Sequence, residues 1–513
     1  MTGGDLFAYS TPAVATAKAV IALAGAALLA LDLVLGPGAR AALARRVLLG
    51  ATALAALLAW MRFAPLAAVS FIHPWEQFHH VLGARYFAEL GYTRLYDCTA
   101  LADAEAGFAV PPAERPLRRL ATNQVERASA ALADPDACKR HFTPARWRAF
   151  AQDVAFFRAA FMPRIWGSIL TDHGFNASPV WTLAGAALAG DEPVRPALLR
   201  RLARIDLLLL AGAFAAAFWS FGFRAGCAAL IFFGTSHLSD FRWVGGAFLR
   251  FDWLALAVAG AALVRRGHGV AGGFALTWAT LLRVFPGFLV AAVVLHAAID
   301  LARRRSLALA PPHRRFALGC LLALATLVPL SVAATGRDAW PGFVANSRKH
   351  LGTPLLNFVG WKSVVSFDPG ATAAALRDRS DVDWYGPWED AVRERFERRR
   401  AAWAAGVAGF VALLGFALAR TPLAWAPLLG VGLVVVAAQI GSYYWSLLLG
   451  WGLLAERVPA LGPLLLVASA ASLGVADVVE GSADAVFAAL SALGVALAFA
   501  VTALAARRGG HTR

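Results

Sequence analysis

Long apolar runs, separated by short arginine-rich gaps, are the feature that most constrains how this chain folds. The runs recur along almost the whole sequence, and their lengths predict about thirteen transmembrane helices. The expected spans lie at 12–36, 47–70, 205–222, 224–237, 250–264, 270–285, 286–302, 316–335, 402–420, 423–440, 443–455, 459–476 and 483–506. Because 59% of the 513 residues are hydrophobic and only 16% are charged, a soluble fold could not cover so much apolar surface. The sequence therefore predicts an all-α polytopic membrane protein.

The position of the basic residues decides what the net charge of +16 means. Arginines gather in short gaps beside the apolar runs, as cytoplasmic loops do under the positive-inside rule. The clusters comprise Arg45, Arg46, Arg265, Arg266, Arg303, Arg304, Arg305, Arg314 and Arg315. This distribution indicates membrane topology, and we expect no nucleic-acid partner.

Two large polar segments fall on the opposite side of the membrane when the arginine clusters are placed inside. These segments, 71–204 and 336–401, form two outer loops of a single membrane domain that covers 1–513. An alternative is that residues 180–190 cross the membrane, which would renumber the later helices. We expect a multi-pass protein of a bacterial cytoplasmic (inner) membrane, with both loops facing the periplasm.

The four cysteines divide into two pairs. Cys98 and Cys138 lie in the first outer loop, where a disulfide forms if the loop faces an oxidising compartment; two free thiols are the alternative. Cys227 and Cys320 lie in apolar runs and are predicted to be small core residues.

The first outer loop opens with HPWEQFHHVLGARYFAELGY, directly after an apolar run. Glu76, His79 and His80 are spaced i, i+3, i+4, which places them on one side of a helix. Such a cluster can bind a divalent metal or supply a general base; the alternative is a polar side that packs against the rest of the loop. We expect this helix to lie at the membrane interface. Its aromatic belt would consist of Trp75, Phe78, Tyr86 and Tyr92.

A second polar segment, WGSILTDHGFNASPVW, returns the chain toward the membrane. Asp172 and His173 precede a Gly-Phe-Asn turn that ends at Asn176, and Pro179 follows just before a short apolar run. This turn presents Asp172 or Asn176 to a site, or it is a docking elbow in which Asp172 caps a helix.

A third polar segment, SHLSDFRWVGGAFLRFDW, separates two apolar runs. Arg242, Arg250 and Asp252 lie at the membrane boundary, where charges are costly unless they are paired or used. Gly245 and Gly246 allow a close backbone approach. The functional prediction is a substrate site, and the alternative is an Arg250–Asp252 pair that anchors the helix.

Two cationic features belong with these segments. Arg283 and Pro286 interrupt the apolar region 270–302, so they should form the outer hairpin between two spans. Lys349 and Lys362 lie in a basic part of the second outer loop. A cationic hairpin beside a cationic loop is what a phosphate at the outer interface requires, and ordinary surface charge is the alternative for the loop.

In order and spacing, residues 47–365 resemble the GT-C superfamily of polytopic glycosyltransferases. That family takes sugars from polyprenyl-phosphate carriers and transfers them outside the cytoplasmic membrane. Its members carry an acidic residue in the first outer loop, where Glu76 stands, and a proline-marked return to the membrane, similar to Pro179. They also show an Arg–Asp pattern at the opening of a span, which looks like Arg250-Phe251-Asp252. A basic residue followed by proline in a later hairpin looks like Arg283 and Pro286.

The resemblance implies a GT-C-like bundle and an inverting transfer of a sugar from a polyprenyl-phosphate donor to a glycan, lipid or protein acceptor, among membrane lipids. Glu76 would be the general base, with Asp172 in reserve. The donor phosphate would be held by Arg242, Arg250, Arg283, Lys349 and Lys362. Other substrate contacts would come from Trp75, His79, His80, Tyr86, His173, Asn176, Trp243 and Asp252.

The sequence also departs from that family. The first loop is long for the simpler members, no acidic pair of the metal-dependent kind is present, and one helix precedes the span that usually comes first. No cofactor is expected, with a divalent metal as the alternative. The rival functions are a transporter or flippase of lipid-linked substrates, and a non-catalytic scaffold that binds lipid-linked glycans.

Overall fold

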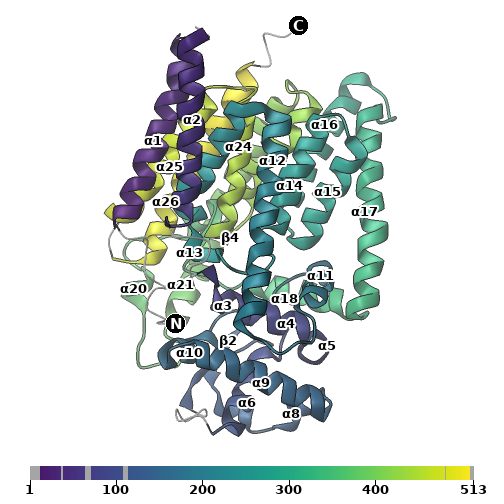
Figure 1. Ribbon diagram of the computed structural model, residues 1–513, viewed down its shortest axis with the longest axis vertical. Coiled ribbons are helices and arrows are strands. Elements are labelled where there is room, and N and C mark those ends of the chain that lie inside the picture. Colours follow the sequence, from purple (N-terminus) through teal and green to yellow (C-terminus); the bar gives the residue numbers. More distant parts are fainter. Residues whose placement is uncertain (1–11, 36–38, 64–70, 108–113, 480, 509–513) are drawn as a thin grey trace.

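The computed structural model describes residues 12–35, 39–63, 71–107, 114–479 and 481–508. Seven helices in these ranges are long and apolar enough to cross a membrane. They are α1 (Pro12–Leu35), α2 (Ala39–Trp60), α12 (Pro196–Thr235), α17 (Pro311–Thr335), α21 (Gly386–Leu418), α25 (Leu461–Val478) and α26 (Ala483–Arg508). In Figure 1 the bundle fills the upper part of the view, with α1, α2, α25 and α26 on one flank and α17 on the other.

The remaining expected runs fall on shorter helices. The helices α14 (Asp252–Arg265) and α15 (Gly269–Leu282) have 14 residues each. They are therefore about 21 Å long, against a hydrocarbon core of about 30 Å. With α16 (Gly287–Arg304) they pack between α12 and α17. The expected run 47–70 ends outside the described residues. The chain is thus an all-α protein with seven candidate spans, and the bundle of thirteen spans stays a prediction.

The segment Pro196–Thr235 consists of two helices. Gly222 has φ 78° and ψ 175°, which no helix contains and which glycine adopts without strain. The ring centroids of Phe214 and Phe233 are 5.6 Å apart. An unbroken helix would separate these residues by about 28 Å. The chain therefore folds back at Gly222, and the runs expected at 205–222 and 224–237 are the two arms of a helical hairpin.

The C-terminal third contains a non-helical break in the middle of apolar sequence. Its elements are η5 (Leu423–Trp425), α22 (Ala426–Leu429), α23 (Val431–Ala437), β4 (Ile440–Gly441), η6 (Ser442–Leu448) and α24 (Leu449–Leu454). The strand β4 pairs antiparallel with β3 (Phe358–Val359), with Phe358 opposite Gly441. The Ser442 N–H also donates to the Asn357 carbonyl oxygen at 2.9 Å. This pairing joins the second polar segment to the break and satisfies backbone groups that would otherwise be buried unpaired.

The second polar segment is mostly helical. It contains α18 (Ala339–Leu351), β3, α19 (Trp361–Ser366) and α20 (Ala373–Leu376), and α21 begins within it. The helix α18 lies at the end of the bundle that faces the first polar segment (Figure 1).

Residues 71–107 and 114–195, here called the loop domain, form a separate layer beyond one end of the bundle (Figure 1). The elements are α3 (Pro74–Gln77), η2 (Phe78–Leu82), α4 (Gly83–Arg85), α5 (Phe87–Leu90), α6 (Leu95–Glu105), β1 (Pro116–Arg119), β2 (Gln124–Arg127), α7 (Ser129–Leu132), α8 (Asp136–Lys139), α9 (Pro144–Ala160), α10 (Pro163–Ile169) and α11 (Pro179–Ala189). The strands β1 and β2 form an antiparallel pair. A disulfide joins Cys98 of α6 to Cys138 of α8, which decides between the two alternatives for these cysteines.

Two buried carboxylates hold the loop domain together. Asp153 accepts hydrogen bonds from Arg85, from the Tyr86 hydroxyl and from the Val194 N–H, at 2.7, 2.9 and 2.8 Å. Asp103 is bonded by Arg115, Arg158 and Trp166. Because a buried carboxylate is costly unless it is fully bonded, each one fixes the elements that supply its donors.

The expectation of an interfacial helix at residues 74–92 is wrong. Phe78 and Tyr86 are fully enclosed, and Tyr92 is 7% exposed. The Phe78 ring packs edge-on against Phe157 and Trp166, with centroids at 5.6 and 5.4 Å. Aromatic spacing alone does not distinguish a belt that faces lipid from the core of a folded domain, and here the loop is large enough to supply its own core.

The helix α11 returns the chain to the bundle. It has 11 residues, about 16 Å, and is not among the seven candidate spans, so the alternative of a span at 180–190 is not supported. Its N-terminus is capped by Ser178, whose hydroxyl accepts the Trp181 N–H at 3.1 Å. Asp172 is therefore not the cap. The Trp181 indole N–H donates to the Leu249 carbonyl oxygen at 3.0 Å and so fastens the loop domain to the segment before α14.

Candidate functional site

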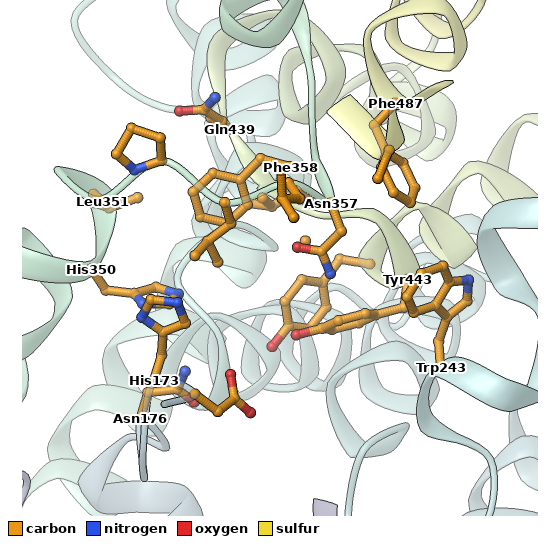
Figure 2. Close-up of a pocket in the computed structure, with 18 of the residues that line it drawn as sticks. His173, Asn176, Trp243, His350, Leu351, Asn357, Phe358, Gln439, Tyr443 and Phe487 are labelled. Carbon is orange, nitrogen blue, oxygen red and sulfur yellow. The ribbon is translucent and has the colours of Figure 1, made fainter. Parts of the chain in front are cut away.

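A cavity of about 1380 Å³ lies where the loop domain meets the bundle. Its walls come from both polar segments, from residues 237–250, from the α15–α16 turn and from the break at 438–444. Of the residues predicted from the sequence, Trp75, Glu76, His79, His80, Asp172, His173, Asn176, Arg242, Trp243, Arg250, Arg283 and Lys362 line it. Figure 2 shows part of the lining, with His173, Asn176 and His350 on one side and Trp243 and Phe487 on the other.

Glu76 and Arg250 form an ion pair in the cavity wall. Glu76 Oε2 lies 2.9 Å from Arg250 Nε, and the two side chains are 16% and 3% exposed. The N–H direction does not give this contact hydrogen-bond geometry, so the pair is held by charge. The alternative of an anchoring Arg250–Asp252 pair does not match, because the arginine reaches across to the loop domain.

His80 stands beside this pair as a neutral ring. Its Nδ1 lies 2.9 Å from the Glu76 carbonyl oxygen, which can only accept, so Nδ1 carries the proton. Its Nε2 is then the acceptor facing Arg250 Nη1 at 3.3 Å. Burial, followed by the charges of Arg250 and Arg283, holds the pKa of His80 well below its usual value. His80 therefore orients Arg250 without adding positive charge.

The local helix geometry explains how Glu76 and both histidines reach the cavity. Residues Phe78–Leu82 form a π-helix. The Nδ1 atoms of His79 and His80 form hydrogen bonds to the carbonyl oxygens of Trp75 and Glu76, respectively. In a regular α-helix, backbone amides would donate to these carbonyl oxygens. The wider π-turn accommodates this competition between side-chain and backbone donors for the same carbonyl oxygens, and such turns are frequent at functional sites.

Arg250 is positioned through its backbone. Asp206 of α12 accepts the backbone N–H of Arg250 at 3.0 Å and that of Phe251 at 3.1 Å. Gly246, at φ 75°, brings its chain so close to Phe71 that any side chain would clash. Its carbonyl oxygen accepts the His73 N–H at 2.9 Å. The close approach expected at the glycine pair therefore occurs, and it is what brings Arg250 up to Glu76.

Arg283 occupies the predicted hairpin between α15 and α16. It is 7% exposed and lines the cavity. Its Nε and Nη2 groups are buried without a hydrogen-bond partner among the described residues. Asp252 begins α14 and gives one oxygen to the Trp253 N–H, at 2.7 Å. A buried guanidinium with two open N–H groups is a site ready to take an anion.

Asp172 lies on the loop-domain side of the cavity. The Trp75 indole N–H donates to its Oδ2 at 2.6 Å, and His79 Nε2 is 3.9 Å away. Burial raises the pKa of Asp172, but the neighbouring His79 and His173 and the Trp75 hydrogen bond outweigh burial, and the pKa is lowered overall. Asp172 is therefore an ionised hydrogen-bond acceptor in the cavity wall.

His79 is the link between Glu76's helix and the loop that follows Asp172. Its Nδ1 donates to the Trp75 carbonyl oxygen, and its Nε2 accepts the Tyr96 hydroxyl at 2.7 Å. The Tyr96 oxygen in turn accepts the Gly174 N–H at 2.9 Å. This chain of bonds fixes the 172–176 turn relative to Glu76.

The opposite end of the cavity carries a second charged cluster. Arg242 Nη2 lies 3.3 Å from His237 Nε2, and its guanidinium lies over the Trp243 ring at 4.9 Å. Its backbone N–H donates to Asp240, which forms a buried ion pair with Lys18 of α1. The first helix of the bundle therefore supports the cavity wall directly.

Three predicted site residues lie elsewhere. Tyr86 points into the loop-domain core, where it bonds Asp153. Lys349 turns away from the cavity and donates to the Leu120 carbonyl oxygen. Asp252 is buried behind Arg283 and outside the cavity lining. Tyr86 and Lys349 therefore do not face the cavity, because helix phase turned each of them to the wrong side.

Several cavity residues were not predicted from the sequence. Tyr443 and Tyr444 approach Arg250, whose guanidinium lies 5.1 and 5.7 Å from their ring centroids. Arg118 of β1 lines the loop-domain side, and His237 lines the opposite end. The polar aromatic stretch GSYYW, between two apolar runs, was the signal that could have pointed to the tyrosines.

No group of three or more His, Cys, Asp or Glu side chains that could hold a metal ion occurs within the described ranges. The Glu76–His79–His80 set is divided instead between an arginine and backbone carbonyls.

Comparison of the chain with protein-family models, with curated proteins and with solved structures finds no match.

Proposed function

We propose that this protein is a membrane glycosyltransferase, which transfers a sugar from a polyprenyl-phosphate donor to an acceptor at the outer face of a bacterial cytoplasmic membrane. The observation that carries this proposal is one carboxylate, Glu76, set against two buried arginines, Arg250 and Arg283, in a large cavity. Base and phosphate-binding groups are the two requirements of such a transfer.

The donor phosphate would bind at the arginines. Arg283 already offers two buried N–H groups without partners. A phosphate there would also attract Arg250, which is joined to Glu76 by charge alone. Donor binding would therefore loosen the Glu76–Arg250 contact and free the carboxylate.

The transfer itself is a single displacement. The acceptor hydroxyl oxygen attacks C1 of the sugar, its proton passes to the Glu76 carboxylate, and the C1–O bond to phosphate breaks. The electron pair leaves with the phosphate, whose charge the arginines stabilise. Attack opposite the leaving group inverts the configuration at C1. Asp172, on the same side of the cavity, is the reserve base.

The apolar part of the cavity wall suits a polyprenyl chain. At the α15–α16 turn and on α18 it is made of Leu282, Val284, Phe285, Phe288, Val344 and Leu351. Val284 and Leu351 are 65% and 56% exposed, so this wall continues onto the outer surface of the helices. Exposed apolar side chains next to a cavity are typical of a lipid-binding surface.

The test is release of polyprenyl phosphate from synthetic polyprenyl-phosphate sugars by the full-length protein in lipid nanodiscs. Glu76→Gln should abolish release, and Glu114→Gln, which alters an exposed carboxylate, should not. Mass spectrometry of envelope glycans after gene deletion would identify the acceptor. Movement of the lipid-linked sugar across vesicles without bond cleavage, unaffected by Glu76→Gln, would instead indicate a flippase.

A further inference from the structure

We propose that the acceptor is a carbohydrate, bound at the loop-domain end of the cavity by His173, Asn176, His350, Asp172 and Arg118; this rests on the proposed function. These five residues, here called the distal subsite, all line the cavity. Four come from the loop domain and His350 comes from α18. In Figure 2, His173, Asn176 and His350 lie together on one side of the cavity, and Trp243 and Phe487 lie on the other side.

The two histidines supply neutral hydrogen-bonding groups. Their ring centroids are 5.3 Å apart in an edge-to-face arrangement. Burial, followed by the charge of Arg118, holds the pKa of His173 well below its usual value. Burial lowers the pKa of His350 to about 4. At neutral pH each ring is therefore uncharged and carries one donor and one acceptor.

The direction of the His173 bonds follows from Asn123. The Asn123 amide nitrogen donates to Thr353 Oγ1 at 2.6 Å, which leaves its oxygen facing His173 Nδ1 at 3.4 Å. His173 Nδ1 is therefore the donor, and its Nε2 is left as an acceptor. No hydrogen bond among the described residues engages the His350 ring or the Asn176 amide.

Asp172 and Arg118 complete the set with one charge of each sign. The Trp75 N–H donates to one oxygen of Asp172, whose side chain is 37% exposed and lines the cavity. Arg118 is fixed by bonds from Nε to the Thr171 carbonyl oxygen at 2.9 Å and from Nη1 to that of Asn123 at 2.5 Å. Its Nη2 makes no bond within the described ranges, so the two N–H groups on that nitrogen remain for a ligand.

This combination selects hydroxyl groups over phosphate or lipid. Neutral imidazoles, an amide and a carboxylate both donate and accept, as neighbouring sugar hydroxyls require. A phosphate would be repelled by Asp172, and a lipid chain would leave these polar groups unpaired. Two aromatic side chains, Tyr385 and Trp388, line the same cavity. The subsite also adjoins Glu76 through Trp75 and His79, so a hydroxyl bound there lies on the side of the base.

The experiment is saturation-transfer NMR on the full-length protein in nanodiscs, with a panel of free disaccharides of glucose, galactose, mannose, arabinose and N-acetylglucosamine at neutral pH. At least one sugar should bind the wild type. His350→Ala and His173→Ala should each weaken that binding about tenfold, the loss expected for unmade hydrogen bonds in a buried site. His350→Asn, which keeps a donor and an acceptor, should restore most of it.

His141→Ala, which alters an exposed histidine of the loop domain, is the matched control and should bind as the wild type does. Arg283→Gln should keep sugar binding and lose binding of undecaprenyl phosphate, which separates failure of the donor site from failure of this proposal. The proposal is overturned if no disaccharide binds the wild type, or if the sugar that binds is unaffected by both histidine variants.

Discussion

Glu76 Oε2 and Arg250 Nε are 2.9 Å apart, although the two residues are 174 positions apart in the sequence and belong to two separate layers of the fold. While Arg250 is paired with Glu76, its guanidinium occupies the carboxylate oxygen. When an arginine leaves its carboxylate for a phosphate, the carboxylate becomes available to accept a proton. Under the proposed function, the pair would therefore couple donor binding to activation of the base.

Replacing Glu76 by Gln should separate these two effects. Sugar transfer should fall by about 10²- to 10⁴-fold, the usual contribution of a general base. Binding of undecaprenyl phosphate should be retained or tighter, because Arg250 loses its competing partner. The measurements are single-turnover transfer and lipid binding in nanodiscs; transfer at the wild-type rate would remove Glu76 from the mechanism.

Replacing Arg283 by Gln should weaken binding of undecaprenyl phosphate at least tenfold, because charge-assisted bonds to phosphate are the stronger kind. The melting temperature should stay the same or rise, since a buried guanidinium with unpaired N–H groups costs stability. Arg140→Gln, at an exposed position of the loop domain, is the control. A large loss of thermal stability in Arg283→Gln would show that the arginine is structural.

The pKa of His350, lowered to about 4 by burial, makes stability depend on pH in a defined window. Between about pH 6.5 and pH 4 the unfolded chain binds a proton that the folded chain excludes, so the free energy of unfolding falls as pH falls through this range. The His173 ring packs against His350; beside the effect of burial, Asp172 raises the pKa of His350, and Lys349 and Arg118 lower it. Thermal unfolding across this window should show a shallower pH dependence in His350→Gln, and an unchanged slope would contradict the assignment.

The Cys98–Cys138 disulfide should stabilise the loop domain locally. Closing a loop between residues 40 positions apart is worth about 4 kcal/mol by restriction of the unfolded chain. Cys98→Ser should therefore make the loop domain the first region cut in limited proteolysis, while the bundle stays intact. Cys320→Ser lies outside this loop and should leave the cleavage pattern unchanged.

The Lys18–Asp240 ion pair is fully buried, with side chains 0% and 3% exposed. Lys18→Met should lower stability by about 3–5 kcal/mol, because it leaves a buried carboxylate without its cation. The double variant Lys18→Met/Asp240→Asn should recover most of that loss. Thermal melts of both variants and the wild type provide the comparison. Equal melting temperatures for the single variant and the wild type would contradict a stabilising role of the ion pair.

Much of the fold could be predicted from local sequence. Apolar run length located the helices, and the gap between the runs expected at 205–222 and 224–237 coincides with the turn at Gly222. Arg283 and Pro286 correctly indicated a hairpin, because a charge and a proline are both unfavourable inside an apolar helix. These signals are local, so they do not depend on how the helices pack.

The site was harder to predict because it depends on contacts far apart in the chain. Tyr86 and Lys349 have the right chemistry, but a π-turn and the phase of α18 turn them away from the cavity. Arg118 lies on a short strand whose position depends on the disulfide-linked core of the loop domain. Tyr443 reaches Arg250 only because the strand pair β3–β4 interrupts an apolar region.

The fold-back at Gly222 also determines which end of the bundle the following segment reaches. An unbroken helix would carry the chain away from the loop domain, whereas two arms packed side by side bring it back toward the end at which the first arm began. Residues 237–250 consequently lie at the end of the bundle that meets the loop domain, and Arg250 meets Glu76 there. One glycine thereby determines whether the two halves of the site lie at the same end of the bundle.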